Sequence, residues 1–203
     1  MDRVLRQVAI AAPGFLADEE GLALYRTALA TAPKGPFLEI GGYCGKSAIY
    51  LGAAARSRST VLYSLDHHRG SEEQQPGAEY FDPTLVDQRG RIDSLPVFRR
   101  TIAAANLEDV VVAVVGRSSV VAGAWATPLA LLFVDGGHSE DDVQADLAGW
   151  LPHLKPDGLL AVHDVFPNPA EGGQAPYHAY LQALESGFVE VCAERSLRVL
   201  ARS

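Results

Sequence analysis

The apolar positions of this chain fall into short unbroken runs that alternate with stretches of helical spacing. The unbroken runs lie at 36–42, 60–66, 108–116, 128–135 and 154–164. The stretches 45–57, 94–107 and 140–154 carry apolar residues at the spacing of an amphipathic helix. An unbroken run predicts a strand that is covered on both faces, as in a parallel sheet. The alternation therefore predicts an α/β fold, with helices on both faces of a mostly parallel sheet.

The two ends of the chain depart from this alternation. Residues 18–33 have helical spacing with Asp18 as the expected N-cap, so 1–34 is expected to form a helical cap. Near the other end, a helix is expected over 177–187. Residues 188–194 and 196–202 then alternate apolar and polar positions. That alternation predicts an antiparallel C-terminal hairpin at the edge of the sheet.

Residues 67–93 show no periodicity, and they contain several glycines and prolines. A loop of this length inside a compact domain is usually functional or mobile. We expect it to form a lid over a cleft, and a disordered surface loop is the alternative. The length of 203 residues fits one domain, so 1–203 is expected to be a single unit.

Composition narrows the kind of partner. The net charge is −8, which argues against a general binder of nucleic acid or of an anionic membrane. The two cysteines, Cys44 and Cys192, form neither a disulfide framework nor a paired zinc motif. Because no long apolar segment opens the chain, we expect a soluble cytoplasmic protein with a small-molecule partner.

Ligands of such sheets bind beyond the carboxyl ends of the strands, so the residues at those ends matter most. The first run closes with LEIGGYCGKS, which has the pattern E-x-G-G-x-x-G-x-S. Its members are Glu39, Gly41, Gly42, Gly45 and Ser47. Glycines let a ligand approach the backbone, and the following helix offers free N–H groups. A tight turn without a ligand is the alternative.

The next two strand ends suit a nucleoside. The second run ends in Asp66, about twenty residues after the glycines, where a carboxylate can accept both ribose hydroxyls. A cap on the next helix is the alternative for Asp66. His67 is expected to line the same cleft, and Gly116 and Ser118 follow the third run, beside the base of such a ligand.

The fourth and fifth strand ends carry a different chemistry. FVDGGHSEDD places Asp135 and His138 three residues apart, and AVHD places His163 beside Asp164. Carboxylate, imidazole and carboxylate in one cleft suit a divalent metal. Alternatives remain open, since Asp135 could cap the helix that starts near Ser139. His163 and Asp164 could be a base with its orienting carboxylate, and His138 could be a surface or supporting group.

On these motifs the chain resembles the class I S-adenosylmethionine-dependent methyltransferases, over about residues 35–166. It is most similar to the metal-dependent O-methyltransferases that act on sugars and natural products. The resemblance implies a Rossmann-like sheet with S-adenosylmethionine at the glycine turn. It implies that the glycines wrap the methionine end, Glu39 reaches its amino group, Asp66 holds the ribose and Ser118 touches adenine. The cofactor-binding set it implies is Glu39, Gly41, Gly42, Gly45, Ser47, Asp66, His67, Gly116, Ser118 and Asp135.

The same resemblance implies a divalent metal held by Asp135, His163 and Asp164. The family usually has an acidic residue at the position of His163, and an imidazole there favours Mn or another transition metal over Mg. His138 matches the spacing of a general base, so His138 and Asp135 are the candidate catalytic residues. A metal-free methyltransferase that uses His138 or His163 as base remains open, as does a non-catalytic S-adenosylmethionine- or nucleotide-binding module. The short N-terminal cap leads us to expect a homodimer.

Overall fold

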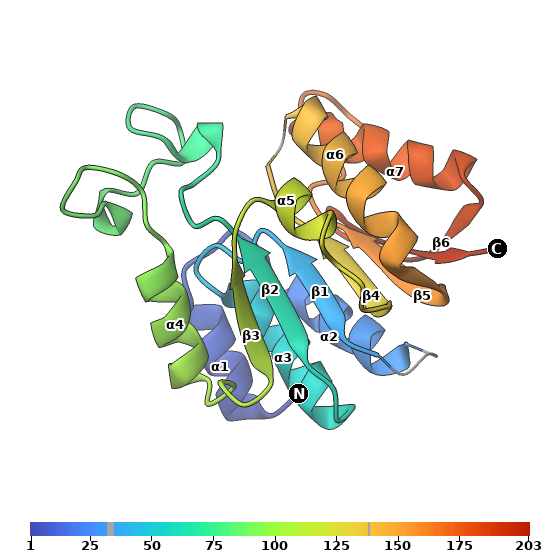
Figure 1. The fold of residues 1–203 in the computed structure, drawn as a ribbon, viewed down its shortest axis with the longest axis horizontal. Helices are drawn as coiled ribbons and strands as arrows, with labels where there is room; N and C mark the ends of the chain where they lie inside the picture. The colour runs from blue at the N-terminus through green and yellow to red at the C-terminus, as the bar shows by residue number, and fades with distance from the viewer. Residues whose placement is uncertain (32–34, 138) are drawn as a thin grey trace.

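The computed structural model describes residues 1–31, 35–137 and 139–203 and is built around one seven-stranded sheet (Figure 1). Its strand order is β3-β2-β1-β4-β5-β7-β6. The mutually parallel strands are β1 (Phe37–Ile40), β2 (Leu62–Asp66), β3 (Val111–Val115), β4 (Leu129–Val134) and β5 (Leu154–Val162). Strand β7 (Leu197–Arg202) pairs antiparallel with β5, and β6 (Phe188–Glu194) pairs antiparallel with β7. The predicted mostly parallel sheet with an antiparallel C-terminal hairpin is confirmed.

Helices cover both faces of this sheet, as predicted (Figure 1). The prediction that run 108–116 is covered on both faces is wrong, because β3 is an edge strand and Val112 and Val115 are exposed. One face packs against α1 (Arg3–Ala11), α2 (Asp18–Ala30), α3 (Lys46–Ser57) and α4 (Leu95–Ala104). The other packs against α5 (Ser118–Ala122), α6 (Glu140–Trp150) and α7 (Ala175–Glu185). Neighbouring residues of one strand enter opposite cores: Leu132 packs with the second helix group and Phe133 with the first. That division is why β4 is apolar at every position and wholly buried.

The start of α2 differs from the prediction, because its N-cap is Ala17 and not Asp18. The backbone N–H of Ala17 donates to Glu20 Oε2 at 3.0 Å, which closes the first turn. Asp18 instead pairs with Arg6 of α1 and accepts a hydrogen bond from Tyr50 Oη of α3 at 2.9 Å. Its carboxylate thus joins three helices, which the local sequence does not reveal.

Two other boundaries are set by proline. Helix α6 ends at Trp150, earlier than predicted, because a 3-10 turn over Leu151–His153 contains Pro152. Helix α7 begins at Ala175, earlier than predicted, with Pro176 in its first turn, where a missing N–H costs nothing. In the described residues, no helix is both long enough and apolar enough to span a membrane.

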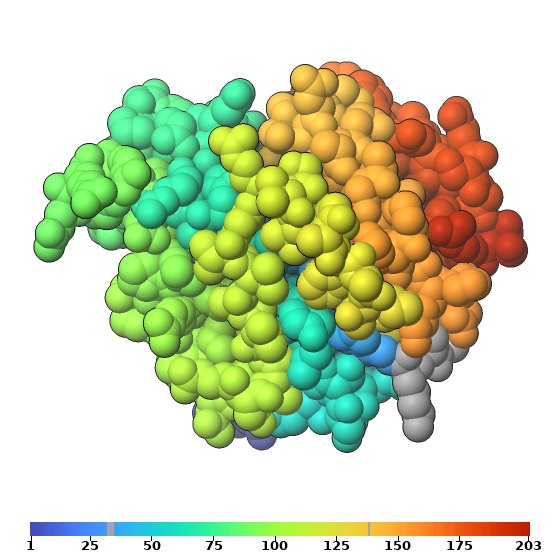
Figure 2. All heavy atoms as spheres, in the orientation of Figure 1, coloured from blue at the N-terminus to red at the C-terminus, as the bar shows by residue number. Residues whose placement is uncertain are grey.

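Loop 67–93 folds on itself and projects from one side of the molecule, at the left of Figure 2. It contains the 3-10 turns η1 (Glu72–Gln74) and η2 (Pro83–Leu85) and an isolated bridge between Val86 and Ile92. Arg69 fastens it internally by donating to Ile92 O at 3.1 Å and to Asp87 Oδ2 at 3.3 Å.

Candidate functional site

A cavity of about 850 Å³ lies at the carboxyl ends of the parallel strands. Of the residues that the sequence singled out, those lining it are Gly41, Gly42, Ser47, Asp66, His67, Gly116, Ser118, Asp135, His163 and Asp164. Residues 69–75 and Tyr80 of loop 67–93 also line it. The fold therefore brings the predicted strand ends together, with part of the predicted lid beside them.

The glycine turn after β1 is shaped by close backbone contact. Gly41 has φ +93°, and a Cβ placed on it would lie 2.0 Å from the carbonyl oxygen of Asp135. Only glycine allows the ends of β1 and β4 to approach this closely. Gly45, with φ +91°, forms the N-cap of α3 against Phe98 and Thr101 and is not among the cavity-lining residues.

Glu39 is fully buried beneath this turn and is also absent from the cavity lining. Among the described residues, neither of its carboxylate oxygens has a hydrogen-bond partner. Burial raises the pKa of Glu39 to about 7. A buried carboxylate without a partner is costly, so it suggests a missing ligand group. One Glu39 oxygen lies 3.6 Å from the point where a Cβ of Gly42 would stand, so the carboxylate lies against the glycine turn.

Asp66 ties the glycine turn to the end of β2. Its Oδ2 accepts from the backbone N–H of Tyr43 at 2.7 Å, and its Oδ1 accepts from that of His68 at 2.7 Å. The next turn is η1, and its N-cap is Ser71. The interpretation of Asp66 as a helix cap is therefore wrong. A carboxylate has further lone pairs, so Asp66 can also accept hydroxyls from the cavity.

Beyond β3, the wall of the cavity contains a buried acid, Asp146, that was not predicted from the sequence. Ser118 Oγ accepts from Trp150 Nε1 at 2.7 Å. Asp146 of α6 lines the cavity, is 6% exposed, and burial raises its pKa to about 6. The signal was present, because Asp146 shares a helix face with the buried Val143, Leu147 and Trp150.

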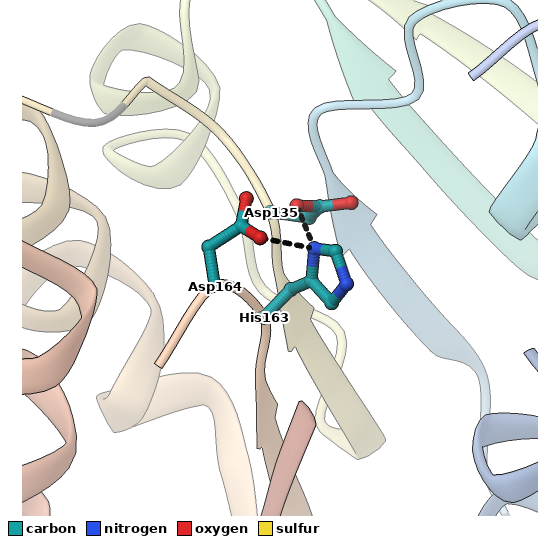
Figure 3. Close-up of side chains that lie close together, drawn as sticks. All are labelled: Asp135, His163 and Asp164. Carbon is teal, nitrogen blue, oxygen red and sulfur yellow. Dashed lines mark hydrogen bonds and ion pairs between the residues drawn. The ribbon is translucent and has the colours of Figure 1, made fainter. Parts of the chain in front are cut away.

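The ends of β4 and β5 bring Asp135, His163 and Asp164 together (Figure 3). Val134 pairs with Val162, so the next residue of each strand stands at the same edge. His163 Nδ1 lies 3.0 Å from Asp135 Oδ1 and 3.4 Å from Asp164 Oδ1. Helix α6 is capped by Ser139, whose Oγ accepts from Asp142 N. The alternative that Asp135 caps this helix is therefore wrong.

The imidazole of His163 is buried and held at both ring nitrogens. Its Nε2 lies 3.1 Å from Glu20 Oε2, a contact that the sequence did not predict. Burial alone would lower the pKa of His163, but the carboxylates of Asp135, Asp164 and Glu20 raise it well above the usual value. Burial in turn opposes ionisation of Glu20, yet His163 brings the pKa of Glu20 down to about 2. In the absence of a metal, these pKa shifts favour a protonated His163 ring between ionised carboxylates.

The same geometry fits a divalent cation. One ligand atom each from Asp135, His163 and Asp164 lies within 4.8 Å of the other two. Nδ1 is the ring nitrogen on the side of the two aspartates, and Nε2 is engaged by a carboxylate. Histidines that ligate metals are usually held in this way through their second nitrogen. His138, the predicted base, lies outside the described residues.

Known proteins resemble this chain in sequence and in fold. A family model described as "Methyltransferase domain" matches residues 38–165. The O-methyltransferase NovP is similar in structure at 16% identity, with 91% of this chain and 78% of that chain covered and a TM-score of 0.67. The SAH-bound methyltransferase PaMTH1 of Podospora anserina shares 16% identity over 100% and 89% of the two chains, with a TM-score of 0.68. An O-methyltransferase of Bacillus cereus in complex with SAH shares 16% identity over 100% of this chain and 92% of that chain, with a TM-score of 0.65. At these identities, the solved structures show a shared fold.

Proposed function

Because the chain belongs to the methyltransferase family and is a class I S-adenosylmethionine-dependent methyltransferase, we propose that it methylates a hydroxyl oxygen of a small molecule with the help of a divalent metal. The observation that carries this proposal is the convergence of Asp135, His163 and Asp164 in the wall of the cavity. The O-methyltransferases among the structural neighbours support an oxygen acceptor.

In this proposal, the cofactor supplies a methyl group on a positively charged sulfur. The turn at Gly41 and Gly42 receives its methionine end, with the negative charge of Glu39 beneath its amino group. Asp66 accepts the ribose hydroxyls, and Ser118 faces the adenine. Ser47, His67 and Gly116 complete the lining. Gly45 shapes the turn rather than touching the ligand.

Asp135, His163 and Asp164 would hold the metal. A divalent cation in this position lowers the pKa of a hydroxyl bound to it, which makes the oxygen a better nucleophile. The imidazole of His163 favours Mn or another transition metal over Mg. His138, three residues after Asp135, is the proposed general base, because a neutral imidazole can accept a proton near pH 7.

The rim of the cavity supports an acceptor with a flat apolar part, such as a hydroxylated natural product. The ring of Phe15 lies 5.9 Å from that of Tyr43 and 5.3 Å from that of Tyr80, measured between centroids. All three residues line the cavity, and Phe15 is 63% and Tyr80 44% exposed. Exposed aromatic faces favour stacking against a planar ligand.

A second candidate is a metal-free methyltransferase on the same site, with His138 or His163 as the base. The contacts of His163 with Asp135 and Asp164 favour this candidate with His138 as the base, because a protonated His163 ring balances the two carboxylates and cannot itself accept a proton.

Chelation separates the two candidates. The protein would be treated with EDTA and assayed with labelled S-adenosylmethionine on a panel of hydroxylated acceptors, with Mg, Mn, Co or Zn restored in turn. We expect activity to disappear and to return most strongly with a transition metal. Asp164→Asn should lose transfer and keep the affinity for SAH, measured by calorimetry. Turnover that survives chelation would select the metal-free enzyme, and a cofactor-bound protein that methylates no acceptor would count against both.

A further inference from the structure

The carboxylate of Glu20 is buried behind the imidazole of His163. It is 3% exposed, belongs to the first turn of α2, and is not among the residues that line the cavity. Glu20 and its hydrogen-bond partner Ser196 both lie outside residues 38–165, the part matched by the family model. The family match therefore says nothing of Glu20, and its role is inferred from its contacts in the structure.

Four donors fix the Glu20 carboxylate. Oε1 accepts from the backbone N–H of Ser196 at 2.9 Å and from its Oγ–H at 2.8 Å. Oε2 accepts from the backbone N–H of Ala17 at 3.0 Å and faces His163 Nε2 at 3.1 Å. The donors come from the start of α2, the β6–β7 turn and the end of β5. A group held from three segments is a rigid acceptor.

This arrangement decides which nitrogen of His163 carries a fixed proton. Three other donors already point at the Glu20 carboxylate, so it accepts hydrogen bonds here and the nitrogen that faces it must donate. That nitrogen is Nε2. Nδ1 is left on the side of Asp135 and Asp164, where a metal ligand or a base is required.

We propose that Glu20 is a positioning residue that keeps a proton on Nε2 of His163 and turns Nδ1 toward the site shared with Asp135 and Asp164. The effect on metal affinity rests on the proposed metal-dependent function. The effect on the ring proton does not.

Glu20→Gln is the variant that tests this proposal. The two donors of Ser196 hold the amide oxygen on their side, so the amide nitrogen faces His163 and donates to Nε2. Nε2 then carries no proton, and the ring keeps its proton on Nδ1, on the side of the two aspartates. Glu19→Gln is the matched control, because Glu19 is the preceding residue of the same helix, is exposed, and lies 3.8 Å from Arg195 rather than near His163.

Two readouts are measured for wild type and both variants. The first is Mn²⁺ affinity, followed by electron paramagnetic resonance, which we expect to fall about 10- to 100-fold in Glu20→Gln and to be unchanged in Glu19→Gln. The second is the ¹⁵N spectrum of the histidine rings, assigned with His163→Asn. We expect a protonated Nε2 in wild type and Glu19→Gln, and a protonated Nδ1 with an unprotonated Nε2 in Glu20→Gln. SAH affinity should be the same in all three.

Glu20→Gln with wild-type Mn²⁺ affinity and a protonated Nε2 would overturn the proposal. Wild-type protein that binds no Mn²⁺ would remove the metal from the proposed function, and the ring spectra would still decide the role of Glu20. If Glu20→Gln does not fold, the Zn²⁺-loaded wild type decides. Zn²⁺ on Nδ1 with the proton kept on Nε2 supports the proposal, and the reverse contradicts it.

Discussion

Burial in the fold disfavours the charged form of Glu39. Its carboxylate is fully buried, and burial raises its pKa to about 7, whereas a carboxyl in the unfolded chain ionises near 4.5. Between these two values, the folded protein binds more protons at this position than the unfolded chain. The contribution of Glu39 to the free energy of unfolding therefore falls as pH rises from about 4.5 through 7, and it is flat above.

Replacing Glu39 by Gln removes this titration. We expect the free energy of unfolding of Glu39→Gln to exceed that of wild type increasingly from pH 5 to 8, by on the order of 3 kcal/mol at the upper end. Urea unfolding across this range measures the difference. If the free energy of unfolding of the two proteins had the same pH dependence, the raised pKa of Glu39 would be contradicted. The same variant should bind SAH more weakly, because the proposed partner of the amino group has lost its charge.

Replacing a glycine by alanine can cost stability through backbone strain and through steric overlap, and comparing Gly41 with Gly77 separates these two costs. Gly77 has nearly the same φ, +92° against +93°, but a Cβ on Gly77 meets no atom within 4 Å. Gly77→Ala should therefore cost only the strain, about 1–2 kcal/mol. Gly41→Ala should cost roughly 1–3 kcal/mol more, because its Cβ overlaps the backbone of Asp135. Thermal unfolding of both variants checks this, and equal losses would be inconsistent with the close contact.

Helix α2 packs closely against α3 at Gly21. A Cβ on Gly21 would lie 2.4 Å from the ring of Tyr50, which is fully buried. Although alanine is favoured over glycine by about 1 kcal/mol in an exposed helix, we expect Gly21→Ala to destabilise the protein by about 1–3 kcal/mol. In a Tyr50→Leu background the loss should shrink, and denaturant unfolding of the four proteins in this cycle gives the coupling. Additive effects would mean that the ring and the glycine do not constrain each other.

The strands were the most predictable elements, because burial on both faces leaves an unbroken apolar run such as 129–134. Helices and strands with exposed apolar residues were harder to predict from the sequence. Helix α1 is capped by Asp2, whose carboxylate accepts from the N–H groups of Val4 and Leu5, although Val4 and Ile10 face solvent. The cap at Asp18 failed for a tertiary reason, since that carboxylate serves Arg6 and Tyr50.

At the scale of the whole molecule, cofactor binding links several strand ends and should stabilise the fold as a unit. At a hundredfold excess over its dissociation constant, SAH adds about 2.7 kcal/mol, which for a chain of this size raises Tm by roughly 5–10 °C. Asp66→Asn, measured at the same SAH concentration, should show a smaller rise, because a ribose acceptor is weakened. Differential scanning fluorimetry is sufficient, and an equal rise in both proteins would argue against Asp66 as a ribose ligand.

The part of the site that could be predicted consists of residues that directly follow neighbouring parallel strands. Asp135 and His163 each follow a parallel strand, and β4 and β5 are neighbours, so their convergence could be expected from the pattern alone. Glu20 could not be expected, because an acid in the first turn of a helix has an ordinary local explanation. Its pairing with His163 depends on how α2 packs against the far end of the sheet.

The contacts of Glu20 also set an order of events during biosynthesis. Its bond to His163 spans 143 positions, and its bonds to Ser196 span 176. Glu20 therefore gains all of its partners only after the chain has been made as far as Ser196. The carboxylate that faces His163 is thus fixed in place only when the turn between β6 and β7 has formed. Such long-range closure is slow compared with local folding.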